Sequence, residues 1–154
     1  MGALSLLVLT AVAATLVTAS DDTEQIRRQE DALAQSLRTP RKDVLLRLTT
    51  SEFKLHLTCG FAVHEFRTDV HRDEWIDSLM GLRTDTYRAV VSSIHVGRGP
   101  SAIVTVNEFW TVHSPRGKRI HKRVLTMDYW VQTQDIWTLS SRDSWLDCKA
   151  SEPW

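Results

Sequence analysis

The chain opens with an apolar run that ends abruptly in polar sequence. The first twenty residues carry no charged side chain, and the stretch from Ala3 to Ala19 is rich in Leu, Val, Ala and Thr. Asp21 and Asp22 then begin a polar segment, a layout typical of a secretory signal peptide. The pattern predicts a signal peptide over residues 1–19, cleaved after Ala19. Because no Lys or Arg precedes the run, an uncleaved N-terminal anchor is the alternative, although a membrane span needs about 20 apolar residues.

Three later segments repeat apolar residues at three- and four-residue spacing, as amphipathic helices do. The first covers residues 22–38, and its start carries Asp21, Asp22 and Thr23 as capping and acidic residues. Pro40 ends this helix and can begin a second, short one. A third helix is predicted from Arg72 to Leu82. The expected buried positions are Ile26, Ala32, Leu33, Leu37, Val44, Leu45, Leu48, Trp75, Ile76, Leu79 and Met80.

The remaining sequence alternates like strands and is punctuated by turn residues. A half-buried strand is expected over residues 51–57, with a turn at Cys59-Gly60 and a short return strand over 61–66. Four longer segments rich in Val, Ile, Thr and aromatic residues follow, at 87–96, 102–112, 119–132 and 136–146. The turns between them are short, so neighbouring strands should run antiparallel. These elements predict one α+β domain over residues 22–147 with a curved antiparallel sheet.

Composition excludes some partners. The chain has 19 basic and 19 acidic residues, so it has no overall field to attract nucleic acid or an anionic membrane. A local basic cluster between Arg116 and Arg123 falls at a predicted hairpin, where a solvated turn explains it. The two cysteines, Cys59 and Cys148, would pair as a disulfide in an oxidising compartment after export. Two unpaired thiols, one of them catalytic, are the alternative.

The order of elements and several local phrases resemble the nuclear transport factor 2-like superfamily, which includes SnoaL-like and ketosteroid isomerase-like domains. The resemblance covers residues 23–144. It rests on these phrases: Thr50-Ser51-Glu52-Phe53, His71-Arg72-Asp73-Glu74-Trp75-Ile76, Gly99-Pro100-Ser101-Ala102-Ile103-Val104, Tyr129-Trp130-Val131 and Ile136-Trp137-Thr138-Leu139. It implies a cone-shaped (cystatin-like) sheet wrapped around the first and third helices, a pocket at the wide end, and frequent homodimers. It also implies parallel first and last strands, which would bring Cys59 near Cys148.

The resemblance does not supply the steroid isomerase mechanism. That chemistry needs an Asp base and, to stabilise the oxyanion, a Tyr and a protonated Asp. The matching positions fall near Leu57, Leu33 and Val124, which are all apolar. Another activity or pure binding is therefore expected, since one fold serves many functions.

Strand alternation suggests a different set of pocket residues. One side of the last two strands would carry Arg142 and Asp128, with Asn107 nearby on the strand before. The guanidinium would keep the carboxylate ionised by lowering its pKa, and Asp128 could then act as a general base. His64 is a second candidate acid or base. The ligand-binding residues expected beside them are Asn107, Thr105, Thr126, Trp130 and Ser140.

Other interpretations stay open. A shift of one residue in strand register would turn all these side chains outward, and Asp128 and Arg142 could form a structural ion pair. The six histidines show no metal-binding spacing, so neither a metal nor a cofactor is expected. Trp75 and Trp137 should pack in the core. An apolar outer sheet face of Val104, Val106 and Trp110 would support a dimer.

The sequence thus favours a secreted or periplasmic domain that binds a small apolar or aromatic molecule, as a homodimer without a stable membrane span. A cofactor-independent isomerase, dehydratase or hydrolase using Asp128 or His64 with Arg142 is one alternative. A protein-interaction module with a vestigial pocket is another.

Overall fold

The computed structural model describes the backbone of residues 3–61, 64–114 and 116–146. It describes the side chains of residues 21–59, 67–114 and 116–146. The helices are α1 (Ala3–Arg38), α2 (Lys42–Leu48) and α3 (Arg72–Gly81). The strands are β1 (Thr49–Phe61), β2 (His64–His71), β3 (Thr84–Val96), β4 (Ser101–His113), β5 (Arg119–Thr133) and β6 (Ile136–Leu146). The predicted order of elements is confirmed.

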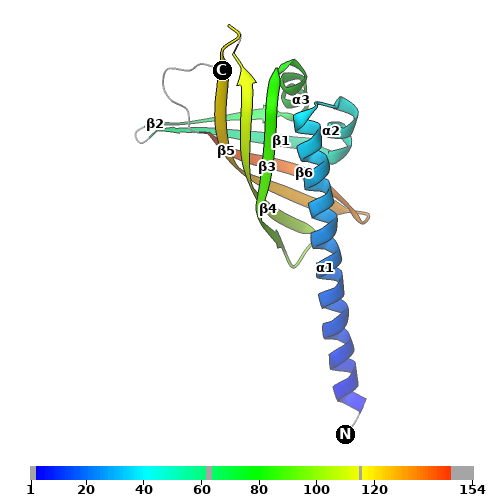
Figure 1. Cartoon of the computed structure of the whole chain (residues 1–154). Coiled ribbons are helices and arrows are strands. Elements are labelled where there is room, and N and C mark those ends of the chain that lie inside the picture. Colours follow the sequence, from blue (N-terminus) through cyan, green and yellow to red (C-terminus); the bar gives the residue numbers. More distant parts are fainter. Residues whose placement is uncertain (1–2, 62–63, 115, 147–154) are drawn as a thin grey trace.

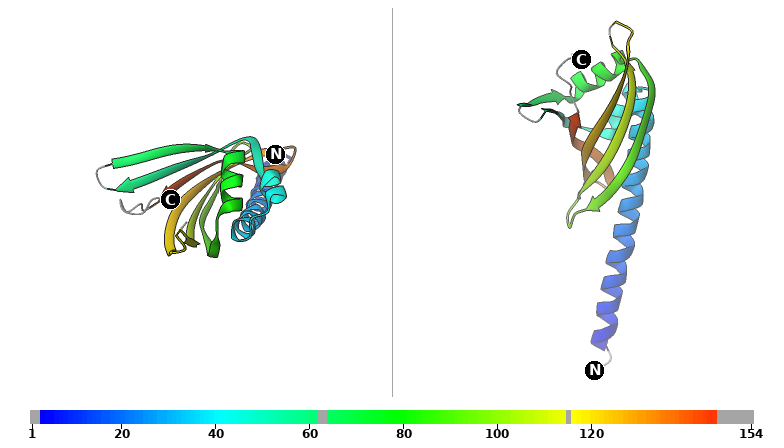
Figure 2. Two further views of the ribbon diagram at one scale, coloured as in Figure 1. Left: turned by 90° about the horizontal axis from the view of Figure 1, so that it is seen from above. Right: turned by 60° about the vertical axis from the view of Figure 1, so that its left-hand side comes forward.

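Within the described part of the chain, six strands form one sheet in the order β2-β1-β6-β5-β4-β3. The sheet is strongly curved, and the helices lie on its inner side (Figures 1 and 2). α1 packs against β3 and β6, and α3 packs against β1 and β2. β1 and β6 run parallel, whereas the other neighbouring pairs are antiparallel. This arrangement is the predicted α+β cone.

The first helix is longer than expected. It begins at Ala3 rather than near Asp22, and its first half projects past the sheet (Figure 1). Ala and Leu favour helix, so the apolar segment continues the helix without a break. Asp21 and Asp22 consequently lie inside α1, and the expectation that they cap its start is wrong for the uncleaved chain. No helix in the described part of the chain is both long and apolar enough to cross a membrane.

The hairpin of β1 and β2 also departs from prediction. Cys59 and Gly60 do not form a turn, because β1 continues through them to Phe61. They pair with β2 in antiparallel register, opposite Phe66 and Glu65. The return strand accordingly occupies His64–His71 rather than residues 61–66.

The core fills the inner side of the curved sheet. Two tryptophans, Trp75 and Trp137, are buried there as predicted, and Phe53 contacts Trp75 with 4.8 Å between ring centroids. The apolar stripe of α1 supplies Ile26, Leu33 and Leu37 to the same cluster. Three expected core residues are not buried: Ala32 and Val44 are half-buried, and Met80 is 49% exposed.

Candidate functional site

A cavity of about 230 Å³ opens between the helices and the inner face of the sheet. Its walls are mostly apolar, and the polar side chains on them are Ser78, Arg142 and Ser144. The apolar lining consists of Leu37, Leu55, Leu57, Trp75, Leu79, Leu82, Trp110, Val124 and Leu146. An apolar cavity with a few polar groups is the usual form of a small-molecule site. This one is smaller than the roughly 300–1,000 Å³ typical of drug-sized ligands.

A buried ion cluster adjoins the cavity through Arg142. Its Nε and Nη2 donate to the two carboxylate oxygens of Asp128, both at 2.6 Å, and Nη1 donates to Glu108 Oε1 at 3.0 Å. Glu108 also accepts from the Tyr87 hydroxyl at 2.8 Å and from Trp110 Nε1 at 3.1 Å. One guanidinium therefore faces two carboxylates in the interior, with polar partners around them. Asp128 and Arg142 converge as the sequence predicted.

Glu30 on α1 adds a further carboxyl group behind this cluster. Its Oε1 accepts a hydrogen bond from Trp130 Nε1 at 2.7 Å. Burial, followed by the Asp128 carboxylate, raises the pKa of Glu30 well above its usual range. The Arg142 guanidinium and the Trp130 hydrogen bond act in the opposite direction and are outweighed, so the site favours the neutral carboxyl of Glu30.

Burial raises the pKa of Asp128 as well, because it outweighs the opposing effect of the Arg142 guanidinium. Arg142 lowers this pKa, as predicted, but the net direction is upward because burial has the larger effect. Asp128 is completely buried and does not line the cavity, whereas Arg142 does. Arg142 thus binds both carboxylate oxygens of Asp128 and is itself a lining residue of the cavity.

The ligand-binding residues predicted on β5 and β6 differ in their burial and hydrogen bonding. Thr126 and Trp130 are fully buried on the inner face, where Thr126 Oγ1 lies 3.3 Å from Ser144 Oγ. The indole N–H of Trp130 is used in its hydrogen bond to Glu30. Ser140 is half-buried and donates to the Tyr129 carbonyl, because the register shifts at this point and breaks the alternation before Arg142.

The predicted facing of β4 is reversed. Thr105 and Asn107 lie on the outer face, and Asn107 Nδ2 donates to Ser92 Oγ at 2.7 Å. Val104 and Val106 are 0% and 1% exposed and belong to the core. They cannot form the outer dimer surface expected of them, and Trp110 faces the cavity. In a half-buried strand the apolar side chains face the protein core, and β4 follows this rule.

Two predictions concern residues whose side chains the structure does not describe. His64 begins β2, but its side chain is not among those described, and Cys148 lies beyond β6. Cys59 stands opposite Leu146 in the parallel β1–β6 pair, two residues before Cys148. This register favours the disulfide, which stays a prediction.

Three members of the cluster were not predicted from the sequence: Glu30, Glu108 and Tyr87. Glu30 falls on the apolar stripe of α1, four residues after Ile26 and three before Leu33. Glu108 continues the alternation of the buried residues Val104 and Val106. An ionisable residue at a core position was the available signal in both cases. No group of three or more His, Cys, Asp or Glu among the described residues is placed to hold a metal ion.

Comparison with known proteins gives structural matches only. No family model matches the chain, and no curated protein sequence matches it. An NTF2-like protein of Cytophaga hutchinsonii superposes with a TM-score of 0.68 at 11% identity, covering 80% of this chain and 97% of that one. An NTF2-like protein of unknown function in nutrient uptake from Rhodospirillum rubrum gives 0.67 at 12% identity, covering 80% and 98%.

A hexachlorocyclohexane dehydrochlorinase, LinA type 2, also matches, with a TM-score of 0.61 at 6% identity, covering 90% of this chain and 95% of the enzyme. Identities this low establish a shared fold and leave the activity open. The element order, the parallel β1–β6 pair and these superpositions together show that the chain has the nuclear transport factor 2-like fold.

Proposed function

We propose that this protein is an exported domain that binds a small, largely apolar molecule in the cavity beside Arg142. The observation that carries the proposal is the cavity wall: an apolar lining with one guanidinium and two serine hydroxyls. Arg142 has N–H groups beyond the three that bind Asp128 and Glu108. The ligand therefore combines an apolar body with an oxygen that accepts a hydrogen bond.

Binding is better supported than catalysis. Leu57 and Val124, which lie near two positions that hold acid or base groups in a ketosteroid isomerase, are apolar residues of the wall. Asp128 is 0% exposed, and both of its oxygens accept from Arg142. A general base must come within hydrogen-bond reach of its substrate. The enzyme alternative therefore requires Arg142 to move or His64 to act.

Filling the cavity tests the proposal. Wild-type protein and Leu57→Trp are incubated with acetophenone, which joins an apolar ring to an acceptor oxygen, and, separately, with a bacterial metabolite extract, and retained molecules are measured by native mass spectrometry. We expect Leu57→Trp to lower retention at least about tenfold, because its side chain occupies the ligand volume. Ile136→Trp, at a residue 59% exposed beside the β5–β6 turn, is the matched control and should retain ligand like wild type.

Circular dichroism checks that both variants fold, since overpacking typically costs about 1–3 kcal/mol. Equal retention by folded Leu57→Trp and wild type would exclude the cavity as the binding site. Arg142→Ala is unsuitable here because it would leave Asp128 and Glu108 buried without a cation.

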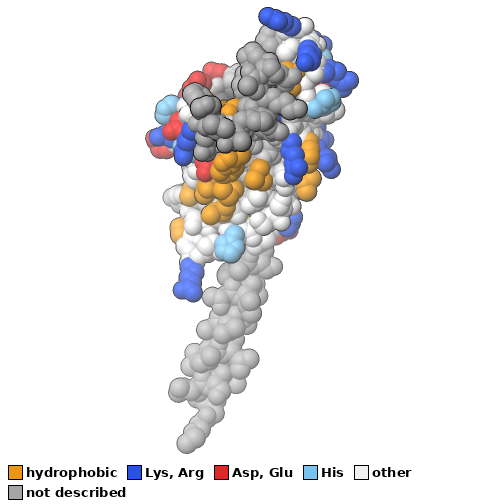
Figure 3. Space-filling model, turned by 90° about the vertical axis from the view of Figure 1, so that its left-hand side faces the viewer, with side chains coloured by type: hydrophobic (Ala, Val, Ile, Leu, Met, Phe, Trp, Pro, Cys, Tyr) orange, Lys and Arg blue, Asp and Glu red, His pale blue; other side chains and the backbone are white. Residues whose placement is uncertain are grey.

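We also propose a homodimer, formed through the outer face of the sheet. Figure 3 shows hydrophobic side chains gathered on this face. Val90, Ile103 and Leu125 are 43%, 40% and 44% exposed there, a group that favours a partner surface. These residues take the place of Val104 and Val106 in the earlier interpretation.

Light scattering after size exclusion tests this interface. Leu125→Lys should convert the dimer to a monomer, because it introduces a charge at the centre of the apolar surface. Ile136→Lys, at a residue 59% exposed beside the β5–β6 turn, is the control and should leave the mass unchanged. A monomeric wild-type protein at micromolar concentration would contradict the proposal.

A further inference from the structure

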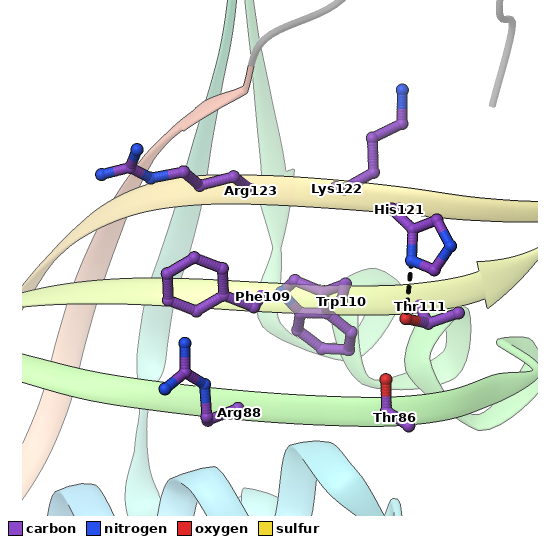
Figure 4. A pocket seen from close by; sticks show the side chains of 8 residues that line it. All are labelled: Thr86, Arg88, Phe109, Trp110, Thr111, His121, Lys122 and Arg123. Atoms are coloured by element: carbon purple, nitrogen blue, oxygen red, sulfur yellow. Dashed lines mark hydrogen bonds between the residues drawn. The ribbon is translucent and has the colours of Figure 1, made fainter.

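A second concavity lies on the opposite side of the sheet, away from the ligand cavity. It is an open groove of about 520 Å³ across β3, β4 and β5 (Figure 4). The register places its residues in two rows across the strands. One row is Thr86–Thr111–His121 and the next is Arg88–Phe109–Arg123. Trp110 and Lys122 complete the lining, which includes no carboxylate.

The second row holds two guanidiniums on either side of one aromatic ring. The Arg88 guanidinium carbon lies 4.5 Å from the centroid of the Phe109 ring, and that of Arg123 lies 5.9 Å from it. Arg123 also donates from Nη2 to Asn107 Oδ1 at 3.3 Å. Among the described residues, no carboxylate pairs with Arg88 or Arg123. Both charges thus remain uncompensated on one small surface.

Two arginines without a carboxylate partner destabilise this surface by charge repulsion unless an anion binds to them. Like charges on one face of a sheet repel, and a cation–π contact at an exposed site offsets only part of that repulsion. Stacking on Phe109 also orients the guanidiniums, which limits their freedom and leaves N–H groups at their edges. A planar guanidinium edge matches a carboxylate or phosphate in bidentate geometry.

The first row adds hydrogen-bonding groups of the same kind. His121 Nδ1 lies 3.0 Å from Thr111 Oγ1, which fixes the imidazole beside the groove (Figure 4). The hydroxyl of Thr86 lies on the same wall. A ligand that reaches both arginines must span β4, because they stand on the strands to either side of it. Adjacent strands are about 4.8 Å apart, so the two arginine backbones are roughly 10 Å apart.

We propose that this outer groove binds a small anion with at least two oxyanion groups, carboxylate or phosphate, one held by Arg88 and the other by Arg123. The site is distinct from the cavity beside Arg142, since the two arginines line the groove and not the cavity, although Trp110 lines both. It also lies within one protomer and does not require a dimer. Binding should weaken as ionic strength rises, because the arginines are exposed to solvent.

The test is an NMR titration of ¹⁵N-labelled full-length protein with citrate and, separately, pyrophosphate, at constant ionic strength set with sodium chloride. We expect shifts concentrated in the amides of residues 86–88, 109–111 and 121–123. The stronger of the two ligands identifies the preferred oxyanion. Arg88→Gln and Arg123→Gln should each weaken binding about tenfold, the loss of one charge-assisted contact.

Arg98→Gln is the matched control, since Arg98 is equally exposed in the β3–β4 turn, away from the groove. Affinity equal to wild type in Arg98→Gln supports the site. An equal loss in all three variants, or shifts scattered over the surface, would show nonspecific charge attraction and overturn it. No binding of either anion would overturn it as well. Binding retained by Leu125→Lys places the site within a single protomer, and loss there would contradict that placement.

Discussion

Arg142→Met is expected to lower the free energy of unfolding by about 3–5 kcal/mol, the usual result of removing one partner of a buried ion pair. The substitution removes the three hydrogen bonds to Asp128 and Glu108, which are 0% and 2% exposed. Both carboxylates then remain in the interior without a cation. Urea denaturation followed by tryptophan fluorescence measures the change.

The combined variant Arg142→Met, Asp128→Asn, Glu108→Gln separates burial of charge from loss of packing. The substituted side chains carry no charge, and the amide at position 108 can accept from Trp110 with its oxygen and donate to the Tyr87 hydroxyl with its N–H, so most of the lost stability should return. Arg98→Met, at an exposed position in the β3–β4 turn, is the surface control, with an expected effect within about 0.5 kcal/mol. A combined variant as unstable as Arg142→Met would show that the guanidinium acts by packing instead.

The placing of Asp128 and Arg142 on adjacent strands could be foreseen because the turn between β5 and β6 is short and β5 alternates regularly. Their direct pairing depends on the register shift between Tyr129 and Trp130. The parallel β1–β6 pair, by contrast, could be predicted only through the resemblance to a known fold. Periodicity gives the elements, whereas the sheet order depends on contacts distant in sequence.

The errors have equally local causes. On β4, both faces carry residues that strands favour, and choosing the polar set as the inner one placed Asn107 inside. The structure puts the apolar set inside, together with Glu108. On β6, the register shift at Ser140 was not visible in the sequence, because nothing in Ser140-Ser141 marks a bulge. Glu30 was not predicted as a buried residue because the helix carries many charged residues.

Glu30→Gln is expected to stabilise the protein at neutral and alkaline pH, by about 1–3 kcal/mol near pH 8. Burial and the Asp128 carboxylate raise the pKa of Glu30, so the folded state holds a proton that the unfolded state releases. Folding stability from this group is complete below its unfolded pKa and declines as pH rises toward the folded pKa. Gln is permanently neutral and resembles the protonated carboxyl, so it removes that decline.

The measurement is a series of urea midpoints from pH 4 to pH 9 for wild type and Glu30→Gln. The two curves should lie close at pH 4 and separate steadily as pH rises, with the variant more stable. The groups around Glu30 that also titrate or carry charge are Asp128, Glu108 and Arg142, and they are present in both proteins. Glu24→Gln, at an exposed position on the same helix, should follow wild type at every pH. Parallel curves would mean that Glu30 is ionised in the fold, and the buried cluster would then contain three carboxylates against one guanidinium. Three buried carboxylates would need a second cation near Trp130 to balance their charge.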